Sequence, residues 1–217
     1  MILITQLYKS VDIRYNELIT ALKKNIENNY INQIILLHEE KLDIPHHPKV
    51  KEIIVGKRLT YKMAFDWAEE HIPSGEIVML ANSDMWFDDT INKIKSIDFS
   101  NTVVALSRYD LNKNNEWVII SETPQYSQDT WIYENPIKLN HDSNLTMGVP
   151  GCENKLAWVI RNSKKNDIKY NVINPALTIK SYHEHLSNVR NYVATDLVHP
   201  WRYPEPYEYV FVSKLDE

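Results

Sequence analysis

Short apolar runs alternate with amphipathic stretches along the first hundred residues. The apolar runs lie at residues 2–8, 33–38, 51–55 and 77–81. Between them, apolar residues recur every three or four positions over 12–28 and 60–71, the period of a helix buried along one face. Apolar strands without strict alternation are typical of a parallel sheet covered on both sides. The pattern therefore predicts an α/β fold with a mixed, mostly parallel central sheet flanked by helices.

The second half of the chain has a less regular pattern. Further strands are expected at 102–107, 116–121, 171–173 and 177–182, the one at 116–121 antiparallel. The turn Gly148-Val149-Pro150-Gly151 is expected to open a helix over 152–162, whereas 121–144 is expected to be rich in loops. Asp12 is expected to cap the first helix. Because no repeat or linker composition interrupts the 217 residues, one domain is predicted.

Composition excludes several classes of function. The net charge is −5 with no basic stripe, so a nucleic-acid partner is not expected. Cys152 is the single cysteine, which excludes an internal disulfide and favours a reducing compartment such as the cytoplasm. No apolar run approaches the length of a membrane span, and the first residues do not resemble a signal peptide.

The four glycines limit how a phosphate group can be held. They form neither a G-x-G-x-x-G motif nor a Walker A loop nor a G-x-S-x-G motif. If the protein binds a nucleotide, a metal ion and side chains must therefore hold its phosphates.

The most informative segment follows the apolar run at 77–81. The chain opens there into Asn82-Ser83-Asp84. Ligands of open α/β sheets bind beyond the carboxyl ends of such strands, and a carboxylate there can hold Mg²⁺ or Mn²⁺ against a phosphate. The alternative is that Asp84 caps a helix that begins near Asp88, because Asp is an ordinary capping residue.

Other polar clusters follow the remaining predicted elements in a definite order. They are Glu39-Glu40, Arg58, residues 127–131, Gly151-Cys152-Glu153-Asn154 and Tyr182-His183-Glu184-His185. In this order the chain resembles the GT-A fold of nucleotide-sugar-dependent glycosyltransferases, most of all small domains found in large DNA viruses and some algae and bacteria. The resemblance runs from ITQLY to HEHLSNVRNY.

The resemblance implies a single GT-A domain over 1–217, with 1–100 as the nucleotide-binding half and 101–217 as the acceptor-binding half. It implies a metal-dependent enzyme, using Mn²⁺ or Mg²⁺, that moves a hexose from a UDP-sugar to a sugar or glycan acceptor. By the same resemblance the transfer is expected to be inverting.

Metal ligands are also implied by the resemblance. Asp84 matches the last residue of the family's Asp-x-Asp motif, which coordinates the metal that bridges the two phosphates of the donor. Asn82 departs from the first Asp of that motif, and Ser83 lies between them. His183 and His185 are two positions apart and share a face of a strand, and one of them is expected to be a further metal ligand or a contact to the pyrophosphate. His183 is taken as the ligand, with His185 as the alternative. Either histidine could equally be a structural residue near a strand end.

The same resemblance places a nucleotide pocket near the ends of the first three strands. Arg58 is expected to meet the phosphates, which suit a guanidinium. The remaining residues assigned to the donor are Thr5, Gln6, Tyr8, Glu39, Asn82, Ser83 and Arg190.

Two carboxylates compete for the role of catalytic base. The segment containing Glu153 resembles the Gly-Gly-Glu-Asp segment that supplies the base of inverting members. Glu153 could instead simply favour the dipole of the helix that it begins. Asp129 is the rival, in a polar stretch that is expected to be exposed, beside Trp131 and Tyr133. It could equally hold sugar hydroxyls, although aromatic clusters are more often core.

Two other functions remain open from the sequence. A nucleotidyltransferase that makes nucleotide sugars usually carries a glycine-rich basic loop after its first strand, and Thr5–Ser10 contains no glycine. A catalytically degenerate module that binds sugar nucleotides or glycans is the second alternative, which Asn82 favours slightly.

Overall fold

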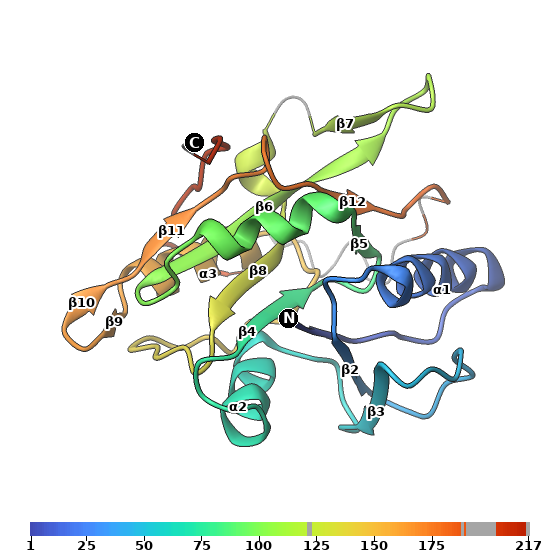
Figure 1. Ribbon diagram of the computed structural model, residues 1–217, viewed down its shortest axis with the longest axis horizontal. Coiled ribbons are helices and arrows are strands. Elements are labelled where there is room, and N and C mark those ends of the chain that lie inside the picture. The colour runs from blue at the N-terminus through green and yellow to red at the C-terminus, as the bar shows by residue number, and fades with distance from the viewer. Residues whose placement is uncertain (121–122, 188, 190–202, 216–217) are drawn as a thin grey trace.

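The computed structural model describes residues 1–120, 123–187, 189 and 203–215 (Figure 1). Within these residues the strands are β1 (Ile2–Thr5), β2 (Gln33–His38), β3 (Val50–Ile54), β4 (Ile77–Ala81), β5 (Met85–Phe87), β6 (Thr102–Leu111), β7 (Trp117–Ile119), β8 (Gln128–Glu134), β9 (Lys164–Lys165), β10 (Ile168–Lys169), β11 (Asn171–Ile173) and β12 (Ser181–His183). The helices are α1 (Asp12–Glu27), α2 (Tyr61–His71) and α3 (Cys152–Arg161), with 3₁₀ helices η1 (Asp89–Ser96) and η2 (Pro124–Tyr126).

A mixed sheet forms the centre of the molecule. Its strand order is β3-β2-β1-β4-β8-β6-β12-β5, with β7 and β11 also paired to β6. Strands β1 to β4 run parallel, β8 lies antiparallel between β4 and β6, and β12 is parallel to β6. The expected α/β architecture is therefore confirmed.

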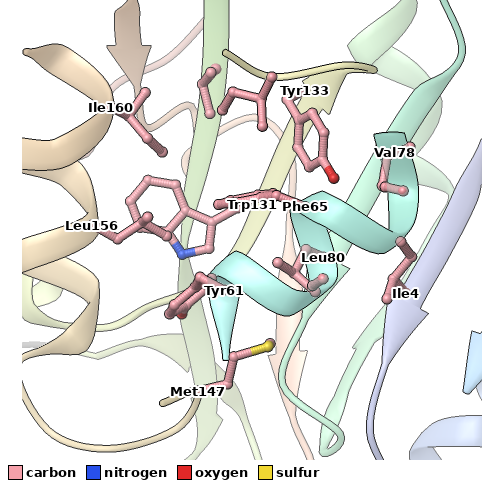
Figure 2. Close-up of a cluster of buried hydrophobic side chains, with 14 of the residues drawn as sticks. Ile4, Tyr61, Phe65, Val78, Leu80, Trp131, Tyr133, Met147, Leu156 and Ile160 are labelled. Atoms are coloured by element: carbon pink, nitrogen blue, oxygen red, sulfur yellow. The ribbon is translucent and has the colours of Figure 1, made fainter. Parts of the chain in front are cut away.

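Helices cover both faces of this sheet (Figure 1). On one face, α1 and η1 pack through Leu18, Leu22, Ile91 and Ile94. On the other face, α2 and α3 bury aromatic and aliphatic side chains against β1, β4 and β8, and Trp131 lies between the two helices and the sheet (Figure 2). The sequence specifies α2 locally, because the Thr60 hydroxyl accepts a hydrogen bond from the amide of Met63 and so caps its N-terminus.

The expectation of a loop-rich stretch over 121–144 is wrong for its middle part. Residues 128–134 form β8, which pairs with both β4 and β6. The polar residues Gln128, Asp129 and Thr130 at its start hide the strand from a hydrophobicity pattern, yet all three are buried. They are buried because this end of β8 lies among other polar side chains rather than in the apolar core.

Two smaller expectations are also wrong. The last strand begins at Ser181 rather than at 177, because Thr178 and Ile179 donate their amides to the carbonyl of Pro175 and make a turn. Asp12 is the first residue of α1 rather than its cap, and Val11 occupies the cap position.

The strand directions bring one end of many strands to the same edge. The carboxyl ends of β1, β4, β6 and β12 meet there, and the antiparallel β8 contributes its first residues, since Ala81 pairs with Thr130. In open α/β sheets this edge is where ligands bind. Among the described residues, no helix combines the length and apolar character needed to cross a membrane.

Candidate active site

A cavity of about 380 Å³ opens at this edge of the sheet. Its walls combine a turn after β4, the ends of β6, β8 and β12, the start of α3 and the first part of α1. The polar and charged residues that line it are Gln6, Tyr8, Arg14, Arg58, Asn82, Ser83, Asp84, Arg108, Tyr126, Asp129, Glu153, His183 and His185.

Asp84, His183 and His185 form a cluster suited to a metal ion. One ligand atom from each residue lies within 4.8 Å of the others. Oδ2 of Asp84 is 3.1 Å from Nε2 of His183 and 4.0 Å from Nδ1 of His185. The structure thus brings both candidate histidines to the predicted carboxylate.

Asp84 does not cap the following helix. Asp88 does so, because its carboxylate accepts a 2.9 Å hydrogen bond from the amide of Thr90 at the start of η1. The side chain of Asp84 instead points into the cavity, and the capping alternative is excluded.

Arg14 of α1 is the second partner of Asp84. Its Nη2 donates to Oδ2 of Asp84, and its Nη1 donates to Glu17 at 2.7 Å and to the carbonyl of Glu184 at 3.1 Å. Glu17 in turn accepts amide hydrogen bonds from Leu186 and Ser187. Arg14 and Glu17 therefore fasten α1 both to the turn that carries Asp84 and to the segment that carries His185.

His183 is held on both sides by carboxylates. Its Nδ1 lies 2.8 Å from Oδ1 of Asp110 while Nε2 faces Asp84. Burial lowers the pKa of His183, but Asp84 and Asp110 outweigh this effect and raise the pKa to about 9. Burial alone would raise the pKa of Asp84, and His183 and Arg14 together hold it well below its ordinary value.

Asp129 is fully engaged by neighbouring donors. Nη1 of Arg108 donates to Oδ2 of Asp129 at 2.9 Å, and the Asn82 side-chain amide donates to Oδ1 at 2.6 Å. Asp129 is 5% exposed, so the expectation of an exposed polar stretch is wrong here. Both carboxylate oxygens of Asp129 therefore already accept hydrogen bonds from neighbouring side chains.

Glu153 lies at the start of α3, just after the predicted turn. Gly151 adopts φ 83°, a left-handed conformation that glycine accepts without strain. The chain changes direction at this residue, and α3 begins at the next one. Burial raises the pKa of Glu153 to about 8, and the charge of Asp129 adds to the rise. A carboxylate with such a pKa is well placed to exchange a proton near neutral pH.

The residues that the resemblance assigns to the nucleotide are divided between two neighbouring cavities. Gln6, Tyr8, Arg58 and Ser83 line the main cavity, whereas Glu39 lines a smaller neighbouring cavity of about 150 Å³ together with Tyr8. The amide of Gln6 hydrogen-bonds to backbone groups of Leu37, Lys57 and Leu59.

Three of the remaining predictions have separate outcomes. Thr5 is buried at the end of β1 and is not among the cavity-lining residues. Arg58 donates to the carbonyl of Met147 at 3.1 Å, which joins the loop after β3 to the segment before α3. Arg190 lies outside the described residues.

Sequence reasoning missed Arg14, Arg108 and Asp110. Arg14 lies within an amphipathic helix, and the other two lie near the end of β6, beyond the predicted limit of that strand. The one signal available was the run Arg108-Tyr109-Asp110 directly after an apolar strand, which matches the pattern that identified Asp84.

Comparisons with known proteins can be set beside this geometry. No family model and no curated protein matches the sequence. Among solved structures, the mannosyltransferase PcManGT from Pyrobaculum calidifontis, in complex with GDP-Man and Mn²⁺, is similar with a TM-score of 0.54. The identity is 12%, and the match covers 86% of this chain and 57% of that chain. The chain has a GT-A fold.

Two further solved structures are more distant. TarS 1–349 from S. aureus, in complex with UDP-GlcNAc, has a TM-score of 0.48 at 13% identity, covering 87% of this chain and 61% of that one. The inositol-1-phosphate CTP transferase from T. maritima has a TM-score of 0.46 at 12% identity, covering 88% and 91%. The neighbours thus include both glycosyltransferases and nucleotidyltransferases. At these identities the likeness concerns the fold, and function has to be argued from the site.

Proposed function

We propose that the protein is a metal-dependent glycosyltransferase that moves a hexose from a UDP-sugar to a hydroxyl of a sugar or glycan acceptor, with inversion. The observation that carries the proposal is that Asp84, His183 and His185 share one cavity with the buried carboxylate of Glu153. The expected division into a nucleotide-binding half over 1–100 and an acceptor-binding half over 101–217 is part of the same proposal.

The donor set of the cluster fits a divalent cation. One carboxylate oxygen and two imidazole nitrogens suit Mn²⁺ better than Mg²⁺, because Mg²⁺ prefers oxygen ligands. Bound between Asp84 and the two histidines, such an ion would neutralise charge on the diphosphate of the donor.

The chain's own residues supply the remaining chemistry. Arg58 lines the cavity and offers a guanidinium to the diphosphate. Glu153, when ionised, takes the proton of the acceptor hydroxyl as that oxygen bonds to the anomeric carbon. The bond from that carbon to the diphosphate breaks, and the nucleoside diphosphate leaves with the electron pair. Glu153 is preferred to Asp129 as the base, since both oxygens of Asp129 already accept hydrogen bonds.

Uridine is proposed as the nucleoside on the family resemblance, with Tyr8 and Glu39 lining the pocket for base and ribose. Calorimetry with UDP, GDP, CDP and dTDP in the presence of Mn²⁺ tests this part alone. Tighter binding of GDP or dTDP than of UDP would replace the nucleoside and leave the reaction class standing.

The reaction class is tested by a thermal-shift screen of nucleotide sugars with and without Mn²⁺, followed by an assay for donor hydrolysis. A ligand that binds only the native state raises the free energy of unfolding by RT ln(1 + [L]/Kd) and therefore raises the unfolding temperature. Stabilisation and hydrolysis that both require Mn²⁺ and both vanish in Asp84→Asn are expected.

Two outcomes favour the alternative functions. Release of pyrophosphate from a nucleoside triphosphate and a sugar 1-phosphate, without hydrolysis of any nucleotide sugar, identifies a nucleotidyltransferase. Stabilisation by a nucleotide sugar without turnover in either assay identifies a binding module.

A further inference from the structure

His183 is placed between two carboxylates that lie on opposite sides of its ring. Nε2 faces Asp84 within the metal cluster, and Nδ1 is 2.8 Å from Oδ1 of Asp110. Of these two contacts, the one to Asp110 points away from the cluster. The proposed function gives Asp110 no role, and the sequence patterns did not single it out.

A carboxylate on one ring nitrogen of a histidine determines whether the other nitrogen can bind a metal ion. Each neutral imidazole has one nitrogen that carries hydrogen and one that carries a free lone pair, and the partner of the first determines which is which. A carboxylate that accepts a hydrogen bond from Nδ1–H leaves the free lone pair on Nε2 and fixes the orientation of the ring. It also makes Nε2 more basic and so a better metal ligand. Here the lone pair would be directed at the space beside Asp84.

Asp110 is itself held in place. Nε of Arg108 lies 3.1 Å from Oδ1 and 3.4 Å from Oδ2 of Asp110, and Nη1 of the same arginine binds Asp129. Arg108 and Asp110 are two apart on β6 and so lie on one face of the strand. The pairing of β6 with β8 shifts register just before them, because Leu106 pairs with Thr130 and Ser107 with Gln128, so the extra residue at the irregularity is Asp129 of β8.

We propose that Asp110 is a positioning residue for the metal site, which orients His183 so that Nε2 is presented to a divalent cation, and that Arg108 holds Asp110 in that position. The inference rests on the metal site of the proposed function. It extends the site from three ligands to a chain of contacts that runs from Asp84 through His183 and Asp110 to Arg108.

The competing interpretation is that Asp110 and Arg108 form a structural ion pair. Removal of such a pair lowers stability without a selective effect on metal binding. Affinity for Mn²⁺ separates the two interpretations, because it can be measured on the folded protein without any donor or acceptor. The probe is Mn²⁺ itself, and the concentration of free ion is measured by its electron paramagnetic resonance signal.

Three variants are compared with the wild type. Asp110→Ala removes the acceptor of Nδ1–H and is expected to weaken Mn²⁺ binding by about 10- to 100-fold, the usual effect of losing such a partner. Asp110→Asn keeps the shape and an acceptor oxygen, so a smaller loss is expected, and it serves if Asp110→Ala does not fold. Asp66→Asn removes one negative charge from the exposed surface of α2 and is expected to bind Mn²⁺ as the wild type does.

The results distinguish this inference from the proposal on which it rests. Wild-type protein that binds no Mn²⁺ overturns the metal site and this inference together. If the wild type binds Mn²⁺, Asp84→Asn does not, and folded Asp110 variants match Asp66→Asn in affinity, the inference fails while the metal site stands.

Discussion

The side-chain amide of Asn82 donates a 2.6 Å hydrogen bond to Oδ1 of Asp129. In the resemblance to GT-A enzymes, Asn82 stands where the Asp-x-Asp motif has its first carboxylate, and this contact shows what an amide does at that position. An aspartate at position 82 would face the carboxylate of Asp129 with no hydrogen between the two oxygens. Asn82 is therefore the residue that the buried Asp129 requires at this position.

Replacing Asn82 by aspartate, as in the Asp-x-Asp motif, is expected to destabilise this protein. Asn82→Asp replaces a charge-assisted hydrogen bond by repulsion and should lower the free energy of unfolding by about 1–3 kcal/mol at neutral pH. Denaturant unfolding measures the change. The reciprocal double variant Asn82→Asp with Asp129→Asn re-forms an amide–carboxylate pair and should recover part of the loss, which a double-mutant cycle quantifies. Greater stability of the single variant would contradict this account.

The pH dependence of turnover should report Glu153. A base acts when ionised, and the pKa of Glu153 is about 8, so kcat/KM should rise with pH up to that region. Asp129→Asn removes a negative charge that raises this pKa, so the midpoint should move to lower pH.

The matched variant for that profile is Glu153→Gln. It cannot accept a proton and should reduce kcat by about 10²–10⁴-fold while donor affinity stays within about twofold. If Asp129→Asn abolishes turnover and Glu153→Gln does not, the roles of the two carboxylates are reversed. A product that keeps the anomeric configuration of the donor would exclude this mechanism altogether.

Stability should also depend on pH through Glu153. Its pKa is raised on folding from 4.5 to about 8, so between these values the native state binds more protons than the unfolded state. Stability from this group therefore falls as pH rises from about 4.5 to 8. Relative to wild type, Glu153→Gln should gain stability across that window, as measured by denaturant unfolding at several pH values. An equal difference at every pH would show that Glu153 does not titrate in this range.

Asp84 should govern the effect of metal. Asp84→Asn keeps the size of the side chain but removes the charge that faces both histidines, so Mn²⁺ should no longer raise the unfolding temperature. Isothermal titration calorimetry of Mn²⁺ into the metal-free protein measures the loss of metal binding directly. Unchanged metal binding in the variant would exclude Asp84 as a ligand.

Trp131 should matter for stability and not for sugar binding. The residue is 1% exposed and packs edge-on against Tyr61 in the core between α2 and α3 (Figure 2). Trp131→Ala should lower the free energy of unfolding by about 3–5 kcal/mol, which is usual for the loss of a large buried aromatic side chain. The Kd for the donor, measured on the folded fraction, should not change. Trp67→Ala, on the half-buried side of α2, is the matched control and should cost less.

The sequence predicted what local patterns encode. The buried strand before Asp84 and the turn before Glu153 were identified because periodicity and glycine placement mark them directly. Strand β8 was missed because Gln128, Asp129 and Thr130 are polar. The partners of the buried Asp129, Arg108 and Asn82, lie far away in sequence.

Arg14 is a second residue whose burial could not be predicted from the sequence pattern. Along the chain it is one charged residue in an amphipathic helix, for which exposure to water is the ordinary expectation. Its burial results from α1 lying against β5 and the turn at Asp84, a contact that the sheet topology creates. Pairing across 70 positions has no signature in a single sequence.

The contacts of Arg14 and Glu17 with residues 184–187 determine when the site can form during synthesis. Those contacts join positions up to 170 residues apart, so the corresponding loop closes late and its closure is entropically costly. While a ribosome is still making the part of the chain before β12, Arg14 and Glu17 lack their contacts with residues 184–187, and Asp84 has neither histidine. The proposed metal site can therefore be completed only in one late step, after most of the sheet can already exist.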